Sequence, residues 1–252
     1  IKVFYEWAEK KTGRKILNKF DDIIKPVIPT REKSAEQMLT WEDIEKMISA
    51  SPNTRNKAVI SCLFELGCRV SEFVNIKMKD LKFDAYGCLV KIDSIKGKLG
   101  RNLKDREVRL VTSVPYLTNW LNIHPDKNNP ESHLWVITAE DQKYNYGNQL
   151  QDQGIRLIMK NAAKRAGIWK KKPVNPHNFR HSRISFLALK GVPEQVIKIL
   201  MGWSPNSRQM STYVHLNSQQ ADAVTLVKVH EVTKKEIAVP NHSPPKTCKL
   251  CA

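Results

Sequence analysis

Two short segments of the chain combine arginine with glutamate or histidine in a way that suits phosphate chemistry. The first reads GCRVSE at residues 67–72, and the second reads HNFRH at residues 177–181. An arginine guanidinium is planar and can hold two oxygens of one phosphate. Phosphoryl transfer without a metal needs such fixed positive charges, a nucleophile and a proton donor for the leaving oxygen. Arg69, His177 and Arg180 are therefore candidate phosphate-binding residues.

Local sequence features indicate how these side chains are presented. Gly67 is placed to end an apolar helix in a left-handed turn, so Arg69 falls between two helices, where it is either solvated or directed into a cleft. Taken alone, Arg69 is more simply a surface arginine. Glu72, three residues further on, could orient it from one helical turn away. His177 and Arg180 are also three residues apart and share one helix face.

Two pairs of possible metal ligands compete with this interpretation. His177 and His181 have the spacing of some zinc sites, but no third ligand with a persuasive spacing stands nearby. Cys248 and Cys251 form a CxxC pair, which is half of a possible zinc ribbon, and a tail rich in Pro and Lys is the simpler interpretation. We therefore expect neither a metal nor another cofactor.

The charge of the chain points to a polyanionic partner. The 252 residues carry 42 Lys and Arg against 25 Asp and Glu, a formal net charge of +17. Positive side chains placed on nucleic-acid phosphates release counterions and so favour binding. A generic basic soluble protein is the alternative. No apolar run of about 18 residues exists, so we expect no membrane partner.

Basic residues gather in two segments that would contact a phosphate backbone. Residues 96–104 read KGKLGRNLK, and residues 160–172 read KNAAKRAGIWKKK, with six positive residues and no acid. A solvated helix end is the alternative for the second segment, but the net charge favours phosphate contact. The predicted DNA-binding residues are Lys96, Arg101, Lys104, Lys164, Arg165, Lys170, Lys171 and Lys172.

The cysteines are typical of a reduced protein. Cys62, Cys68 and Cys88 stand in apolar surroundings, as buried thiols do, and no signal peptide is recognisable. We therefore predict a cytoplasmic location. The chain starts at Ile1 rather than at Met, so we expect a fragment of a longer protein.

Hydrophobic periodicity predicts a mostly α protein with one small antiparallel β-sheet, an α+β fold. Thr40 and Asn175 are expected to cap helices, and another helix is expected to begin at Asn53 or Thr54. Further helices are expected at 70–78, 114–122, 148–166 and through 176–231, and strands around 89–92 and 107–111, joined by the basic hairpin.

Two later positions complete a pattern. Trp203 follows Met201-Gly202, and Tyr213 stands ten residues beyond it in the sequence STYVH. In this order and spacing, Gly-x-Arg-x-x-Glu, His-x-x-Arg-His, Gly-Trp and Tyr resemble the boxes of the tyrosine recombinases, the family of phage integrases and Xer recombinases. The likeness is greatest to archaeal integrases and covers about residues 38–231.

The resemblance implies roles for the first two segments. Arg69 and Arg180 would be the catalytic arginines that hold the phosphate. Glu72 would support Arg69, and His181 would also have a supporting role. His177 would be a general acid/base or a hydrogen-bonding group.

The resemblance also implies a nucleophile and a proton donor. Tyr213 would attack the phosphate, although a tyrosine taken alone is more often a packed core residue. Trp203 stands where many members have histidine; its indole N–H can donate to a phosphate oxygen but cannot act as an acid or base. Lys98, in a Gly-Lys-Leu-Gly turn, would protonate the leaving oxygen, with Lys96 as the runner-up.

A site-specific DNA recombinase of the integrase type is the function that the resemblance implies. It would cut and rejoin double-stranded DNA at recombination sites through a 3′-phosphotyrosyl intermediate, without ATP or a metal. Four protomers would assemble on two sites, in the nucleoid or, if a virus encodes the protein, in the host cytoplasm. The alternatives are a type IB topoisomerase and a non-catalytic DNA-binding protein on the same fold.

The implied domain order has four parts. Residues 1–25 would be the end of an N-terminal DNA-clamping helical domain, and 26–38 a linker. Residues 39–232 would form the catalytic domain with the tyrosine-recombinase fold, and 233–252 a tail. Apolar residues at helical spacing within 217–232 could dock on a neighbouring protomer.

Overall fold

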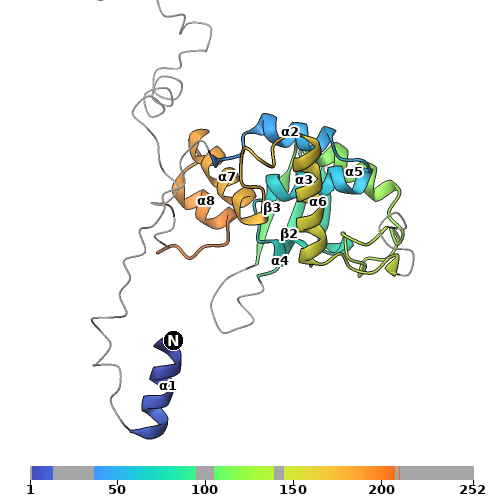
Figure 1. Ribbon diagram of the computed structural model, residues 1–252. Helices are drawn as coiled ribbons and strands as arrows, with labels where there is room; N and C mark the ends of the chain where they lie inside the picture. The colour runs from blue at the N-terminus through green and yellow to red at the C-terminus, as the bar shows by residue number, and fades with distance from the viewer. Residues whose placement is uncertain (1, 14–36, 95–104, 139–144, 208–209, 211–252) are drawn as a thin grey trace, which may run out of the picture. The chain divides into compact units, whose positions relative to one another are not determined.

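The computed structural model describes residues 2–13, 37–94, 105–138, 145–207 and 210. The chain divides into two compact units, residues 1–33 and 34–252 (Figure 1). The first unit contributes one described helix, α1 (Lys2–Thr12). Phe4 and Trp7 share a face of this helix, with ring centroids 5.9 Å apart, and both are exposed. The predicted linker lies almost wholly outside the described residues, and the domain boundaries stay predictions.

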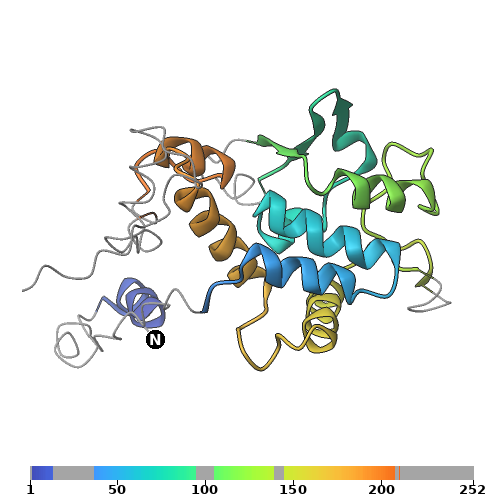
Figure 2. The ribbon, with the colours of Figure 1, turned by 90° about the horizontal axis from the view of Figure 1, so that it is seen from above.

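Helix α3 (Thr54–Leu66) forms the centre of the second unit. It packs against α2 (Trp41–Ser49), α5 (Val114–Asn122) and α6 (Asp152–Arg165), and Figure 2 shows α2 and α3 side by side. Of its 13 residues, ten are buried. A helix that is covered on several sides needs apolar residues on all of its faces rather than along one stripe. Residues 58–64 of α3, AVISCLF, are almost all apolar.

Helices α2 and α3 begin, and α3 ends, where the sequence predicts. Thr40 Oγ1 accepts a hydrogen bond from the Asp43 backbone N–H at 3.3 Å, and Asp43 Oδ2 accepts one from the Thr40 N–H at 3.0 Å. Asn53 Oδ1 accepts from the Asn56 N–H at 2.9 Å at the start of α3. Gly67 ends α3 in the left-handed region, with φ of 56°. Local side-chain chemistry thus sets where these helices begin and end.

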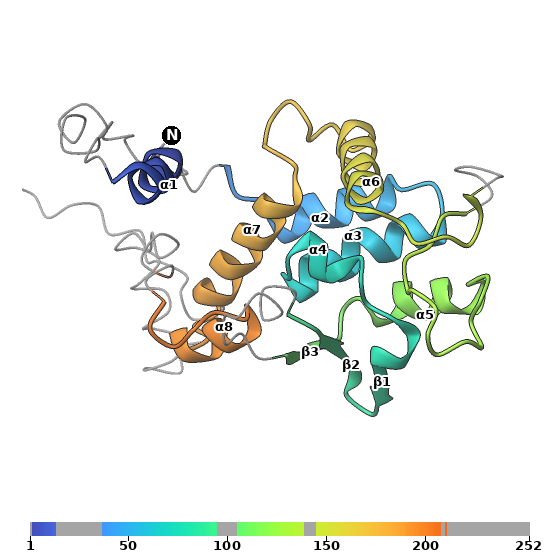
Figure 3. The same cartoon turned by 90° about the horizontal axis from the view of Figure 1, so that it is seen from below.

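A three-stranded antiparallel sheet packs against α3 through the third strand in the sequence, β3 (Arg106–Leu110). Its strands, in spatial order, are β1 (Leu81–Asp84), β2 (Gly87–Ile92) and β3. The last pair in the β2–β3 register is Ile92 with Arg106, and Figure 3 shows β3 on the side of the sheet that faces α8. The predicted sheet is therefore present, with β1 as an additional strand.

Helix α4 (Val70–Phe73) is shorter than the predicted helix at 70–78. Beyond it, the Met78 N–H donates to the Ser132 carbonyl at 2.9 Å, and the Ile76 carbonyl accepts from the Leu134 N–H at 2.8 Å. A helix that continued to residue 78 would need the Met78 N–H for its own hydrogen bond to the Val74 carbonyl. A short 3-10 turn, Met78–Asp80, then leads into β1.

Helix α6 begins four residues later than the predicted start at 148. The Leu150 N–H donates to the Trp135 carbonyl at 2.8 Å, and Gln149 forms a bridge with Val136. These residues are extended, so the helix can begin only after them.

Helices α7 (Pro176–Leu189) and α8 (Glu194–Leu200) lie at one side of the second unit (Figure 1). Asn175 Oδ1 accepts from the Asn178 N–H at 2.9 Å, as predicted for the cap of α7. Helix α7 packs against α3, and α8 packs against both α7 and β3. A second, smaller hydrophobic core lies here, made of Ile184, Leu187, Ile197, Met201 and Met210.

The prediction of a mostly helical fold with a small antiparallel sheet is confirmed. Cys62, Cys68 and Cys88 are buried and unpaired, and burial raises the pKa of the Cys68 thiol to about 12. Within the described ranges, no helix has both the length and the apolar character needed to cross a membrane.

Candidate active site

Arg69 is held by Glu72 at the start of α4. The Arg69 Nη1 donates to Glu72 Oε1 at 2.8 Å, and the Arg69 backbone N–H donates to Glu72 Oε2 at 3.0 Å. The Glu72 side chain is 2% exposed, whereas that of Arg69 is 26% exposed. The left-handed turn at Gly67 therefore brings Arg69 into a junction where its guanidinium is oriented but still accessible.

A second arginine, Arg106, shares the same carboxylate. Its Nη2 donates to Glu72 Oε2 at 2.7 Å, and its Nε donates to the Leu200 carbonyl at 2.7 Å. Arg106 was not among the residues predicted for the site. Its position in the strand could have indicated it, because Arg106, Val108 and Leu110 alternate on the buried face of β3.

The electrostatic state of Glu72 follows from these partners. Burial acts to raise the pKa of its carboxyl, but the charges and hydrogen bonds of Arg106 and Arg69 outweigh burial, and the pKa is lowered. Glu72 is therefore an anion at neutral pH that is shared between two guanidinium groups.

Arg180 joins the turn at Gly67 to the end of α8. Its Nη1 donates to the Gly67 carbonyl at 2.9 Å and its Nη2 donates to the Met201 carbonyl at 2.7 Å. The residue is 6% exposed. Burial lowers its pKa to about 10, and the charges of Arg69 and then Arg106 act in the same direction. The guanidinium thus stays protonated at neutral pH in a crowded positive site.

Trp203 follows α8 and lies next to Arg180. The Arg180 Cζ is 5.5 Å from the centroid of the Trp203 ring. A cation over an aromatic ring is attracted by the negative face of the ring. The structure therefore brings Arg69, Glu72, Arg180 and Trp203 together, as the sequence analysis expected, and adds Arg106.

His177 and His181 face each other on α7, the helix that carries Arg180. Their rings are T-shaped with centroids 3.9 Å apart, and the two Nε2 atoms point at each other in a hydrogen bond. His177 is exposed and His181 is buried. No cluster of three possible metal ligands occurs in the part of the chain that the structure describes. The two histidines are one helical turn apart on α7, and Arg180 lies between them in the sequence.

Several predicted site residues lie outside the described residues. They are the proposed nucleophile Tyr213, the proton donors Lys98 and Lys96, the basic residues Arg101 and Lys104, and the pair Cys248 and Cys251. The structure places the two ends of the hairpin that carries Lys96 and Lys98, at Ser94 and Asp105, where the Ser94 N–H donates to Asp105 Oδ1 at 3.1 Å.

The basic residues after α6 are of two kinds. Lys164, Arg165, Lys170 and Lys171 are exposed. Lys172 instead pairs with Asp43, with 2.5 Å between Nζ and Oδ2, and its side chain is 22% exposed. This contact joins the loop after α6 to the start of α2, so Lys172 has a partner within the protein.

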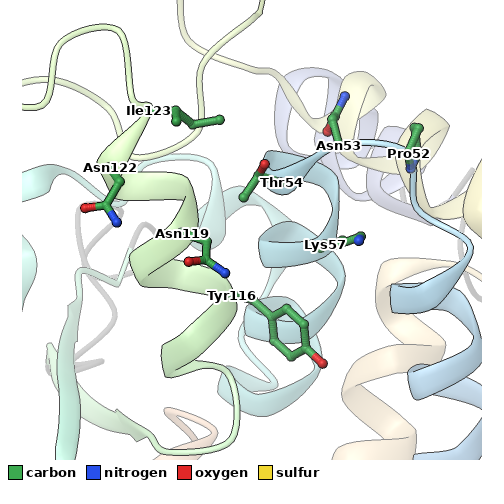
Figure 4. A pocket seen from close by; sticks show the side chains of 8 residues that line it. All are labelled: Pro52, Asn53, Thr54, Lys57, Tyr116, Asn119, Asn122 and Ile123. Atoms are coloured by element: carbon green, nitrogen blue, oxygen red, sulfur yellow. The ribbon is translucent and has the colours of Figure 1, made fainter.

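A separate hollow of about 490 Å³ lies between α5 and the start of α3 (Figure 4). Its lining is mostly polar and contains none of the predicted site residues: Pro52, Asn53, Thr54, Lys57, Tyr116, Asn119, Asn122 and Ile123. The arginine cluster is therefore the candidate active site on the strength of its charge and hydrogen bonding, not because it is a large cavity.

The chain is similar in sequence to known integrases and recombinases. The model of the phage integrase family matches residues 37–220. The tyrosine recombinase XerC of Staphylococcus aureus strain USA300 is 26% identical over 243 residues, which cover 94% of this chain and 74% of that protein.

Solved structures show the same fold. The crystal structure of XerA recombinase superposes with a TM-score of 0.58 and 25% identity, over 78% of this chain and 65% of that one. The XerH site-specific recombinase bound to a palindromic difH substrate gives a TM-score of 0.57 at 20% identity, over 76% of this chain and 53% of that one. The chain therefore spans about two thirds of the XerA structure and about half of the XerH structure.

These matches are to recombinases, and they give the topoisomerase alternative no support. The family match covers more than half of the chain and includes every described member of the arginine cluster. The chain belongs to the phage integrase family, and the predictions of a tyrosine-recombinase catalytic fold and of a tyrosine-type site-specific DNA recombinase are confirmed.

Proposed function

We propose that the arginine cluster is the place where this recombinase holds the scissile phosphate of double-stranded DNA. The observation that carries the proposal is the arrangement of Arg69, Glu72 and Arg180. Arg69 is oriented by a buried carboxylate through two hydrogen bonds, and Arg180 is fixed by two backbone carbonyls. Guanidinium groups fixed in advance stabilise the charge that develops on the phosphoryl oxygens.

The proposed reaction has a nucleophile and a leaving group on opposite sides of this phosphate. The Tyr213 hydroxyl gives its proton to a general base, for which His177 is the candidate, as its oxygen attacks phosphorus and forms a 3′-phosphotyrosyl bond, while the bond from phosphorus to the 5′-oxygen breaks. Lys98, with Lys96 as the alternative, gives its proton to that oxygen and leaves a free 5′-hydroxyl. His177 and Trp203 donate hydrogen bonds to the phosphate. The phosphotyrosyl bond conserves the energy of the broken bond, so a second 5′-hydroxyl can rejoin the strand without ATP.

The partner in this proposal is a recombination site in double-stranded DNA. The net charge of +17 and the exposed Lys164, Arg165, Lys170 and Lys171 favour contact with phosphates. Among similar structures, XerH is bound to a difH substrate and the Tn1549 transposon integrase is in complex with circular intermediate DNA. We extend the proposal to four protomers on two sites, to an archaeal or viral source, and to action in the nucleoid or host cytoplasm.

Covalent trapping tests the proposal. Wild-type protein and the Tyr213→Phe variant are mixed with sheared, nicked DNA from the source replicon, and complexes that survive detergent but not protease are recovered and sequenced. We expect adducts at one discrete sequence with the wild type and none with Tyr213→Phe. Adducts spread over all sequences would favour topoisomerase activity, and adducts that persist in Tyr213→Phe would remove Tyr213 as the nucleophile.

A further inference from the structure

The Arg106 side chain connects strand β3, to which the residue belongs, with two helices, α4 and α8. Arg106 is the first residue of β3, and its side chain is 4% exposed. Ile92 and Arg106 form the last pair of the β2–β3 ladder, so Arg106 stands at the base of the hairpin that carries Lys96 and Lys98. From there it reaches α4 through Glu72 and the end of α8 through Leu200.

The carboxylate of Glu72 divides its two oxygens between the two arginines. Oε1 accepts from the Arg69 side chain at 2.8 Å, while Oε2 accepts from Arg106 at 2.7 Å and from the Arg69 backbone N–H at 3.0 Å. A carboxylate held at both oxygens cannot rotate freely. The contact with Arg106 therefore fixes the orientation of Oε1, and Oε1 fixes the guanidinium of Arg69.

The turn after α8 is shaped around the same arginine. Gly202 has a φ of 62°, and a Cβ built on it would lie 2.7 Å from Arg106 Nη1. Nη1 is buried and has no hydrogen-bond partner in the described part of the chain. The positive φ favours glycine at this position, and the guanidinium lies against the space that a Cβ would fill. Arg106 thus sets the path of the turn that presents Trp203.

We propose that Arg106 is a positioning residue for DNA strand cleavage, which holds Arg69 through Glu72 and holds the turn before Trp203 through the Leu200 carbonyl and Gly202. The inference rests on the proposed role of Arg69 at the scissile phosphate. Arg106 itself is too deeply buried to be the group that contacts DNA. It differs in this from Arg69, whose side chain is 26% exposed.

The same strand offers a matched control. Arg109, three residues further along β3, also forms an ion pair, with 2.6 Å between its Nη1 and Asp84 Oδ1. Both side chains of this pair are more than a third exposed, at 35% and 38%. An exposed pair of this kind contributes little to stability. Arg106→Met and Arg109→Met therefore remove the same charge and the same number of donors from one strand, in two different surroundings.

The experiment measures single-turnover cleavage of a nicked duplex that carries the sequence recovered by covalent trapping, with protein in excess so that all DNA is bound. We expect Arg106→Met to slow cleavage about 100-fold, since a misplaced catalytic group costs on this order. DNA affinity should change less than about 3-fold, because no phosphate contact is lost. Arg109→Met should cleave at the wild-type rate.

A double-mutant cycle separates positioning from general damage. If Arg106 acts through Arg69, replacing Arg106 in an Arg69→Lys background should slow cleavage far less than it does in the wild type, because Arg69 is no longer there to be positioned. Arg106→Lys keeps the charge but cannot contact Glu72 and the Leu200 carbonyl with a rigid fork, so it should fold normally and lose about 10-fold in rate.

Three results would overturn the inference. The first is cleavage at the wild-type rate by folded Arg106→Lys and Arg106→Met. The second is that replacing Arg106 slows cleavage by the same factor in the wild type and in the Arg69→Lys background. The third is that Arg109→Met slows cleavage as much as Arg106→Met does. A different result bears on the proposed function: if Arg69→Lys alone cleaves at the wild-type rate, Arg69 does not hold the phosphate. Thermal melts of every variant show which rates come from folded protein.

Discussion

The replacement Glu72→Gln is the most direct test of how the arginine cluster is held together. The change keeps the size and shape of the side chain but removes its negative charge. It also turns one oxygen into an NH₂ group, which must then face a guanidinium donor of either Arg69 or Arg106. Arg106 would be left as a buried cation without its counter-ion.

The burial of the pair sets the size of the effect. The side chains of Arg106 and Glu72 are 4% and 2% exposed. Removing one partner of such a buried pair costs about 3–5 kcal/mol, because the remaining charge stays desolvated. For a domain of this size class, each kcal/mol lowers the Tm by about 2–4 °C, so we expect Glu72→Gln to melt roughly 6–20 °C below the wild type.

The pH dependence of the free energy of unfolding gives an independent check that ionised Glu72 stabilises the folded protein. The pKa of Glu72 is lowered in the folded protein from its ordinary value of 4.5, since the contributions of Arg106 and Arg69 outweigh burial. The stability that Glu72 contributes is therefore complete above pH 4.5 and is lost as the pH falls through the folded-state pKa. The stability difference between wild type and Glu72→Gln should be constant near neutrality and shrink in acid.

Urea denaturation across this pH range, with thermal melts at pH 7, measures both quantities. The matched control is Glu131→Gln. Glu131 also has two cationic partners, Lys77 at 2.9 Å and Lys79 at 2.6 Å, but its side chain is 60% exposed. Its replacement should leave the Tm close to that of the wild type. The reasoning is refuted if the two variants lose the same stability, or if the deficit of Glu72→Gln does not change in acid.

Two further predictions concern the turn after α8 and the basic surface. Gly202→Ala should lower stability by about 1–3 kcal/mol in urea denaturation, because it combines a strained backbone with a Cβ that would lie 2.7 Å from a buried guanidinium nitrogen; Gly167→Ala, also at positive φ but with open space around its Cβ, should cost less. Lys170→Ala should weaken DNA binding and reduce its salt slope by about 1. Lys172→Ala should change that slope less, since its ammonium is held 2.5 Å from a carboxylate, and equal slopes for the two variants would contradict this.

Features that depend on neighbouring residues could be predicted from the sequence. The caps at Thr40, Asn53 and Asn175 and the left-handed stop at Gly67 are set by side chains within three residues of the helix ends. The hydrogen bonds between Glu72 and the preceding arginine are of the same local kind. Short-range chemistry of this type has few alternatives, so the sequence indicates it directly.

Features that depend on distant partners could not be predicted. Arg106 is separated by 34 residues from Glu72 and by 94 from Leu200, and the Lys172 contact with Asp43 spans 129. Strand propensity does not predict that an arginine points into the core. A run of basic residues does not show which of its lysines has an acidic partner elsewhere in the chain. The same reason accounts for the helix lengths. The Ser132 carbonyl accepts from the Met78 N–H, and the Ile137 N–H donates to the Asn148 carbonyl, and these are backbone groups that a longer α4 and an earlier α6 would have used.

The balance of charge in the cluster explains why it suits a phosphate. Arg69 and Arg106 both pair with the Glu72 carboxylate, and Arg180 lies close enough to feel its charge, so the described cluster carries three positive charges and one negative charge. Burial is the main cause of the lowered pKa of Arg180, and the charges of Arg69 and Arg106 lower it further, as repulsion between neighbouring cations does. In the proposed function, the scissile phosphodiester would bring a negative charge and relieve this repulsion. The backbone carbonyls and the Glu72 carboxylate already hold the guanidinium groups in place, so the remaining positive charge would act on the phosphate.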